Sequence, residues 1–227
     1  MTAPDTVVAK LDELNWSEWL AKNGRNTAIG AGILVVLASG VLLYKTSQAR
    51  KEAFASQELM TARSSAESGN LPLAASDLSK LVDRFGGTRA AEEAVILLNQ
   101  VRMVQGQRDV AVNALQSFVR GRHSDYALAS AYSLLGAGLE DQGKARDAAE
   151  AYRQASASAR LDFQKAQYLL DAGRAFTLAG DSTAAKAAYN EVLTKFGRID
   201  QAAEARVRMA ELGGTVPPTP PAPDTTS

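Results

Sequence analysis

The sequence of 227 residues contains no cysteine and a single histidine, His123. These absences exclude disulfide bonds, zinc–thiolate sites, iron–sulfur clusters and sites with several histidine ligands. The 25 Lys and Arg residues are balanced by 25 Asp and Glu residues, which argues against nucleic-acid binding through a broad basic face. Aromatic residues are also few, 14 against 42 alanines, which is typical of closely packed helices. The composition favours a helical, non-enzymatic protein without a cofactor.

Residues 26–44 form a stretch without a charged side chain, between Arg25 and Lys45. As a helix these residues would be about 29 Å long, which matches the hydrocarbon core of a bilayer. A cleaved signal peptide would have a shorter apolar region and a small-x-small cleavage site, and Lys45–Lys51 offers no such site. A buried helix of a soluble protein rarely runs so far without a charge. The stretch therefore predicts a transmembrane helix embedded in the lipid bilayer.

The orientation of this helix is not decided by charge, because basic residues occur on both of its sides. Gly24, Ala28 and Gly32 recur every four residues and would place small side chains on one helical face. Such a face allows another membrane helix to approach closely. The alternative is that glycine and alanine are simply common in membrane helices.

The rest of the chain contains an internal repeat of 37 residues, marked by Gly69, Gly106, Gly143 and Gly180. Each of these glycines is followed five residues later by an alanine. Nine residues after each glycine stands a large side chain, in order Leu78, Leu115, Tyr152 and Tyr189. Glycine suits the left-handed backbone at a helix C-terminus, and the later positions form a stripe at helical spacing. One helical hairpin cannot bury its own face, so the repeat predicts stacked hairpins.

The predicted fold class is all-α, with a single N-terminal transmembrane helix followed by an α-solenoid of about four hairpins and a capping helix. The first helices of the hairpins are expected near 49–68, 88–105, 125–142 and 160–179. The second helices are expected near 72–85, 108–119, 145–158 and 182–196, and the capping helix near 199–212. The first of these helices can continue the membrane helix through Lys45–Glu52 without a break. The predicted organisation is a tail at 1–25, the span at 26–44, the repeat domain at 45–212 and a disordered proline-rich tail at 213–227.

The recurring positions of this 37-residue repeat resemble the tetratricopeptide repeat, in particular at Leu135-Gly136 and at Ala148 with Tyr152. The resemblance implies a concave face that binds proteins, built from positions about 13, 10, 6 and 3 before each turn glycine. Its side chains suit an apolar or amphipathic peptide segment, and they lack the Lys/Asn cluster with which some members hold a C-terminal carboxylate. The alternative for Leu59, Ile96 and Leu170 is that they belong to the core and the assumed register is wrong by one residue. The candidate binding residues are Leu59, Arg63, Glu93, Ile96, Gln100, Met103, Ser130, Ser133, Ala137, Glu140, Gln167, Leu170, Arg174 and Thr177.

The whole layout, including the entry Trp19–Gly24 into the span, resembles the YfgM-type ancillary subunits of the bacterial Sec translocon. This resemblance implies an inner-membrane protein with a cytoplasmic N-terminus and a periplasmic repeat domain. It also implies three kinds of partner, namely Sec translocon subunits, a membrane-anchored periplasmic prolyl-isomerase-like chaperone, and unfolded or amphipathic client segments. Two alternatives remain, a scaffold for envelope biogenesis with the same topology and a cytoplasmic membrane-tethered repeat scaffold.

His123, Ser124 and Asp125 contain the side chains of a hydrolytic triad, but adjacent residues of one loop cannot adopt its geometry without help from elsewhere. An exposed turn histidine is the expected role of His123. An enzyme with an unrecognised site is therefore the least favoured interpretation.

Overall fold

The computed structural model describes residues 16–218, and within this range it contains nine α-helices and no strand. The chain divides into two compact units, residues 1–51 and 52–227. Helix α2 (Trp16–Glu67) contributes residues to both units. The second unit also contains eight further helices: α3 (Leu71–Phe85), α4 (Arg89–Val104), α5 (Arg108–Phe118), α6 (Asp125–Asp141), α7 (Ala145–Ser158), α8 (Asp162–Leu178), α9 (Ser182–Lys195) and α10 (Gln201–Glu211).

The first unit consists of the beginning of α2, which runs unbroken through the predicted span. One helical segment of the described chain, Ala28–Glu67, is long and apolar enough to cross a membrane by length and composition. Ala28 and Gly32 lie exposed on this helix, and a Cβ atom on Gly24 or Gly32 would meet nothing within 4 Å. The predicted N-terminal tail falls mostly on residues 1–15, which lie outside the described residues.

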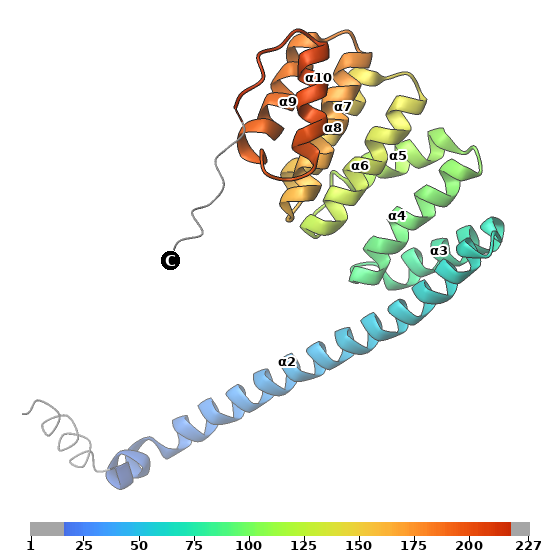
Figure 1. Ribbon diagram of the computed structural model, residues 1–227. Coiled ribbons are helices and arrows are strands. Elements are labelled where there is room, and N and C mark those ends of the chain that lie inside the picture. The colour runs from blue at the N-terminus through green and yellow to red at the C-terminus, as the bar shows by residue number, and fades with distance from the viewer. Residues whose placement is uncertain (1–15, 219–227) are drawn as a thin grey trace, which may run out of the picture. The chain divides into compact units, whose positions relative to one another are not determined.

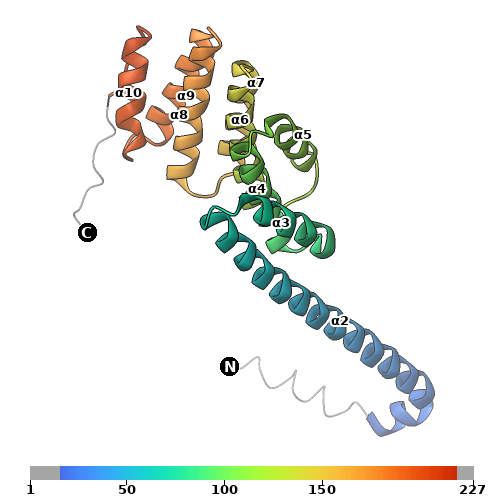
Figure 2. The same cartoon turned by 90° about the vertical axis from the view of Figure 1, so that its right-hand side faces the viewer.

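The second unit is a stack of helical hairpins, as the 37-residue repeat predicts (Figures 1 and 2). The end of α2 pairs with α3, and the pairs α4–α5, α6–α7 and α8–α9 follow, with α10 packed on α8 and α9. Helix α2 runs from the predicted span through Lys45–Glu52 into the first hairpin without a break, as expected from the sequence. Residues 213–218 of the predicted proline-rich tail contain no helix, and residues 219–227 lie outside the described residues.

The four repeat glycines end the first helix of each hairpin in the left-handed conformation, with φ between 73° and 82°. Around Gly106 the backbone N–H of Gly106 donates to Met103 O at 3.0 Å, and that of Gln107 donates to Arg102 O at 2.8 Å. This pair of bonds is the Schellman motif, and it recurs at the other three glycines. A side chain with a Cβ atom would be strained at these positions, so the glycine column has a local backbone cause.

Two clusters of buried apolar residues form the core, one from Ala55 to Val101 and the other from Val112 to Met209. In the second cluster the ring of Tyr152 on α7 lies directly against Gly136 on α6. A methyl group at Gly136 would come within 2.7 Å of Tyr152 Cε1, and Gly173 stands in the same relation to Tyr189. In these two hairpins the tyrosine nine positions after the turn glycine therefore packs against the glycine seven positions before it.

Candidate functional site

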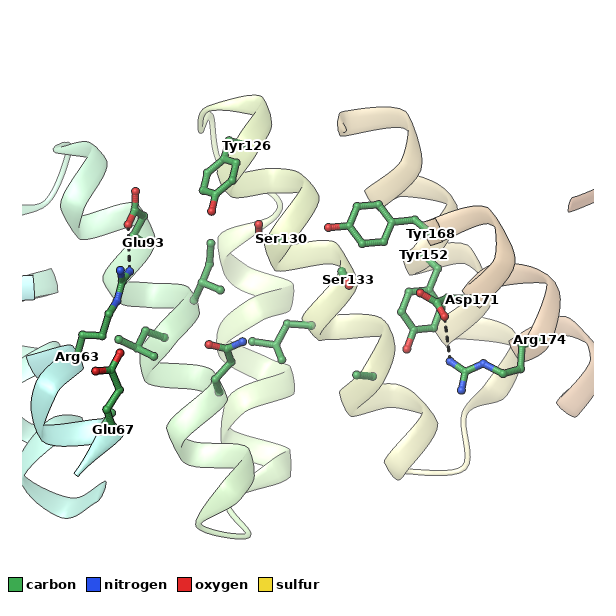
Figure 3. A pocket seen from close by; sticks show the side chains of 16 residues that line it. Arg63, Glu67, Glu93, Tyr126, Ser130, Ser133, Tyr152, Tyr168, Asp171 and Arg174 are labelled. Carbon is green, nitrogen blue, oxygen red and sulfur yellow. Dashed lines mark hydrogen bonds and ion pairs between the residues drawn. The ribbon is translucent and has the colours of Figure 1, made fainter. Parts of the chain in front are cut away.

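A groove of about 630 Å³ crosses the inner surface of the repeat domain (Figure 3). The first helices of all four hairpins, α2, α4, α6 and α8, contribute side chains to it. Tyr152 of α7 also reaches it, because Gly136 and Ala137 on α6 leave room for the ring. The lining residues are Arg63, Ala66, Glu67, Glu93, Ile96, Leu97, Gln100, Tyr126, Ser130, Ser133, Leu134, Ala137, Tyr152, Tyr168, Asp171 and Arg174.

One end of the groove is formed by α2 and α4 and carries an open ion pair. Arg63 Nη2 lies 3.4 Å from Glu93 Oε2, and both side chains are about half exposed. Because exposed ion pairs contribute only about 0–1 kcal/mol to stability, this pair adds little to folding. Arg63 and Glu93 can therefore separate and pair instead with the charged groups of a ligand.

The opposite end is formed by α6, α7 and α8 and is more buried. Arg174 lies 3.4 Å from Glu140 Oε2 and 3.3 Å from Asp171 Oδ1. The Tyr152 hydroxyl donates to the same Glu140 oxygen at 3.1 Å. The second oxygen, Oε1, is buried and has no hydrogen-bond partner among the described residues.

Burial also shifts the pKa values of two side chains at this end of the groove. It raises the pKa of Asp171, and the charge of Arg174 opposes the shift. Burial and the negative charge of Glu140 raise the pKa of Tyr152 far above its ordinary value of 10.0. Tyr152 is therefore a neutral donor at any physiological pH, and its hydrogen bond fixes the position of Glu140.

Between the two ends the groove combines aromatic, hydroxyl and aliphatic groups. Tyr126 and Tyr168 point into it from α6 and α8, with Ser130 and Ser133 between them (Figure 3). Ile96, on α4, supplies aliphatic surface and also packs against the core. Tyrosine offers a large contact area with few rotatable bonds and a hydroxyl for hydrogen bonding. This arrangement can hold an extended peptide through apolar contacts in the middle and charged contacts at both ends.

The structure brings together most of the sequence-predicted concave-face residues and separates the rest. Leu59 and Leu170 are core residues, 6% and 4% exposed, and do not line this groove. Met103 packs against the second core cluster, and Glu140 is ion-paired with Arg174 but does not line the groove. Gln167 is exposed but lies outside the groove, and Thr177 lines a separate depression near α10. The predicted residues that do line the groove are Arg63, Glu93, Ile96, Gln100, Ser130, Ser133, Ala137 and Arg174.

Several lining residues were not predicted from the sequence, and one signal could have found some of them. In α8 the groove positions are shifted by one residue, so that Tyr168 and Asp171 line it instead of Gln167 and Leu170. The groove also extends one helical turn past the predicted positions, to Glu67 and Tyr126. Extending the expected stripe by one turn at each end would have included both.

His123 is a partly buried residue of the hairpin link, which corrects the expectation of an exposed turn histidine. Its ring stacks on Phe118 with centroids 3.7 Å apart, and its Nδ1 lies 3.2 Å from Glu92 Oε1. Glu92 also accepts from the Ser124 hydroxyl at 2.6 Å. These contacts tie the link between α5 and α6 to α4, and they commit the Ser124 hydroxyl to a structural bond.

A stack of helical hairpins with a groove along its first helices defines an α-solenoid of the kind that generally serves as a scaffold for protein–protein interaction and is typically non-catalytic. The model of the tetratricopeptide repeat-like domain family matches residues 17–213, and the chain belongs to this family. A comparison with curated proteins gave no match.

Two solved structures share the fold at low sequence identity. The first is a tetratricopeptide repeat protein from Parabacteroides merdae ATCC 43184, with a TM-score of 0.55 and 12% identity over 70% of this chain. The chain spans only 60% of the length of that protein. The second is MamA protein, with a TM-score of 0.53 and 19% identity over 70% of this chain and 82% of MamA. At these identities the likeness extends to the fold alone.

Proposed function

We propose that this chain is a membrane-anchored scaffold whose repeat domain binds extended segments of other proteins in the groove of Figure 3. The observation that carries the proposal is the distribution of groups along the groove. Tyr126, Tyr168 and Ile96 offer apolar surface in the middle, and arginine–carboxylate pairs stand at both ends. An amphipathic or unfolded client segment matches this order of groups.

The anchor in this proposal is the apolar stretch 26–44 within α2. It would cross the bacterial inner membrane with the N-terminus in the cytoplasm and the repeat domain in the periplasm. Length and composition support the span, and the resemblance to the YfgM-type family supports the orientation. A tether of this kind raises the local concentration of the groove at the membrane, so that weak contacts with a client suffice.

The partners in this proposal are Sec translocon subunits and a membrane-anchored periplasmic prolyl-isomerase-like chaperone. The groove would receive client segments as they leave the export channel and keep them near the chaperone. The small-residue face of Gly24, Ala28 and Gly32 would contact a membrane helix of the translocon. In this role no bond of the client is made or broken.

Orientation is the first test. A tag after Ser227 and external protease on spheroplasts should lead to loss of the whole repeat domain, while the N-terminal tail stays protected. Loss of the tag alone is not sufficient, because the tail could be cut separately. A repeat domain that survives until the membrane is lysed would overturn the periplasmic role.

Crosslinking from inside the groove tests the partners. A photo-crosslinking side chain at Gln100, which is exposed in the groove, should give adducts with translocon or chaperone subunits and with exported clients. The matched control is the same group at Gln154, which is exposed on the second helix α7. Equal adducts from both positions, or a partner list without export components, would overturn the proposal.

A further inference from the structure

The helix ends of the repeat domain form two edges with different chemistry. At one edge, here called the link edge, the second helix of one hairpin ends and the first helix of the next begins. The other edge, here called the turn edge, contains the repeat glycines. The link edge comprises residues 52–54, 84–92, 118–126, 158–163 and 195–201. The turn edge comprises residues 64–73, 102–110, 139–147, 177–184 and 208–214.

Hydrogen bonds between successive hairpins make the link edge continuous. The Glu52 carboxylate accepts from the backbone N–H groups of Arg89 and Ala90 at 2.9 and 3.0 Å. Glu92 accepts from Ser124 one hairpin later, and Asp125 pairs with Arg160 at 3.3 Å at the next link. The first residues of α4, α6 and α8 therefore lie side by side on one border of the domain.

Aromatic side chains are found on only one of these edges. The link edge contains six aromatic residues by sequence, and the turn edge contains none. Two of the six, which do not line the groove, are unusually open for aromatic residues, with Phe54 62% and Phe163 53% exposed. Leu161, 53% exposed, stands next to Phe163. Open aromatic and leucine side chains beside polar groups are typical of surfaces that enter the headgroup region of a bilayer.

The two edges also differ in charge. The link edge has seven basic and five acidic side chains, whereas the turn edge has five basic and seven acidic ones. On the turn edge Arg108, Arg146 and Arg208 are each paired with a carboxylate. On the link edge the side chains of Arg89, Arg122 and Arg198 have no carboxylate partner among the described residues, and all three residues are exposed. Arginines in this state are available to phosphate groups.

The position of the link edge in the chain suggests what covers it. Glu52 lies on this edge and follows Tyr44, the last residue of the predicted span, by only eight positions. Eight residues span at most about 26 Å, even in a fully extended chain, so Glu52 lies within that distance of Tyr44. The turn edge is first reached at residue 64, twenty positions after Tyr44. If the span crosses the membrane, Glu52 at the start of the link edge lies within about 26 Å of the end of the span.

We infer that the link edge of the repeat domain binds the surface of an anionic bilayer. Phe54, Leu161 and Phe163 enter the headgroup region, and Arg89, Arg122 and Arg198 bind lipid phosphates. This inference rests on the membrane anchor of the proposed function, and it adds a second attachment that holds the domain against the membrane. Its partner is the lipid itself.

The absence of cysteine allows a direct test on the full chain, because one introduced cysteine can be labelled alone. Leu161→Cys on the link edge and Leu178→Cys on the turn edge are a matched pair, since both leucines are well exposed. Each variant is labelled with a fluorophore and reconstituted into vesicles that contain lipids with a quencher near the headgroup. Val36→Cys, at the middle of the predicted span, reports insertion of the anchor in matched vesicles whose lipids carry the quencher near the end of the acyl chains.

In vesicles of phosphatidylglycerol and phosphatidylcholine we expect about threefold or more stronger quenching at position 161 than at position 178. The difference should shrink in pure phosphatidylcholine, at high salt and in the triple variant Arg89→Gln, Arg122→Gln, Arg198→Gln. Equal quenching at 161 and 178, with position 36 quenched, would overturn this inference and leave the anchor intact. An unquenched position 36 would instead overturn the anchor of the proposed function.

Discussion

The first two hairpins and the last two build the same contact from different residues. In hairpins three and four a tyrosine of the second helix, Tyr152 or Tyr189, packs on a glycine of the first. In hairpin one the matching residues are Leu78 and Ala62, and both are fully buried. In hairpin two the residues at the matching positions are Leu115 and Asn99. In hairpins one, three and four the pair of side chains therefore keeps a similar combined volume although its residues differ, because helices can approach only as far as the pair allows.

Asn99 shows how far this exchange can go. It is 1% exposed, and both polar atoms of its amide are hydrogen-bonded, since Nδ2 donates to Val95 O at 2.8 Å and Oδ1 accepts from Arg102 at 3.1 Å. A buried amide is tolerated when its hydrogen bonds are made within its own helix. The second hairpin accepts a polar residue at this position, whereas the third and fourth hairpins have space only for a hydrogen atom.

The largest effect should follow from removing a ring of the C-terminal pair. Tyr189→Ala should lower the free energy of unfolding by about 3–5 kcal/mol, because the ring is 2% exposed and leaves a cavity above Gly173. Urea unfolding of the full chain in detergent, followed by circular dichroism, measures the loss. Tyr126→Ala is the matched control, and it should change stability by less than about 0.5 kcal/mol because Tyr126 is exposed. Similar losses from both variants would contradict the pairing of Tyr189 with Gly173.

The next effect concerns the glycine of the same contact. Gly136→Ala should destabilise the domain by about 1–3 kcal/mol, although alanine favours helices, because its Cβ atom would lie 2.7 Å from the Tyr152 ring. Adding Tyr152→Leu recreates the Ala62–Leu78 pair of hairpin one and should recover most of the loss. A double-mutant cycle on thermal unfolding tests this exchange. Strictly additive losses would show that the two positions do not share one volume.

The next prediction compares two links between hairpins, one at the start of the domain and one later in the chain. Glu52→Ala should cost about 1–2 kcal/mol, because it leaves two backbone N–H groups at the start of α4 without their carboxylate. Arg160→Ala removes the exposed pair with Asp125 at a later link and should cost less than about 0.5 kcal/mol. Unfolding midpoints of the two variants give the comparison. A larger loss for Arg160→Ala would reverse it.

The smallest effect concerns how stability depends on pH, and it follows from the burial of Asp171 at one end of the groove. Burial raises the pKa of Asp171 above its ordinary 3.8, so the folded chain holds this proton more tightly than the unfolded chain. The free energy of unfolding should therefore fall as pH rises through the window just above 3.8, and ionised Asp171 lowers stability at neutral pH. Asp171→Asn should gain stability relative to the parent chain as pH rises from about 4 to 7. Urea unfolding across this range measures the difference, and a gain that does not change with pH would contradict it.

The hairpins could be predicted from sequence because their signals are local. A glycine in the left-handed conformation ends a helix whatever lies around it, and Gly69, Gly106, Gly143 and Gly180 all do so. The groove was predicted less completely. The register in α8 is set by how Leu170 enters the core, and no spacing within one helix reveals which of two neighbouring residues faces inward. Glu52, which binds the start of α4 from 37 residues away, carried no recognisable signal.

The sequence by itself determined the helices, the turns between them, the repeat period and the apolar stretch 26–44, because each depends on residues within a few positions of one another. Tertiary packing decided which side chains meet across hairpins. Stacking brings Arg63, Gln100, Ser133 and Arg174 into one groove from helices far apart in the chain. It also gathers the aromatic and unpaired basic residues of the links on one edge. These surfaces exist only once hairpins 37 residues apart lie side by side, since no single hairpin contains more than a part of either.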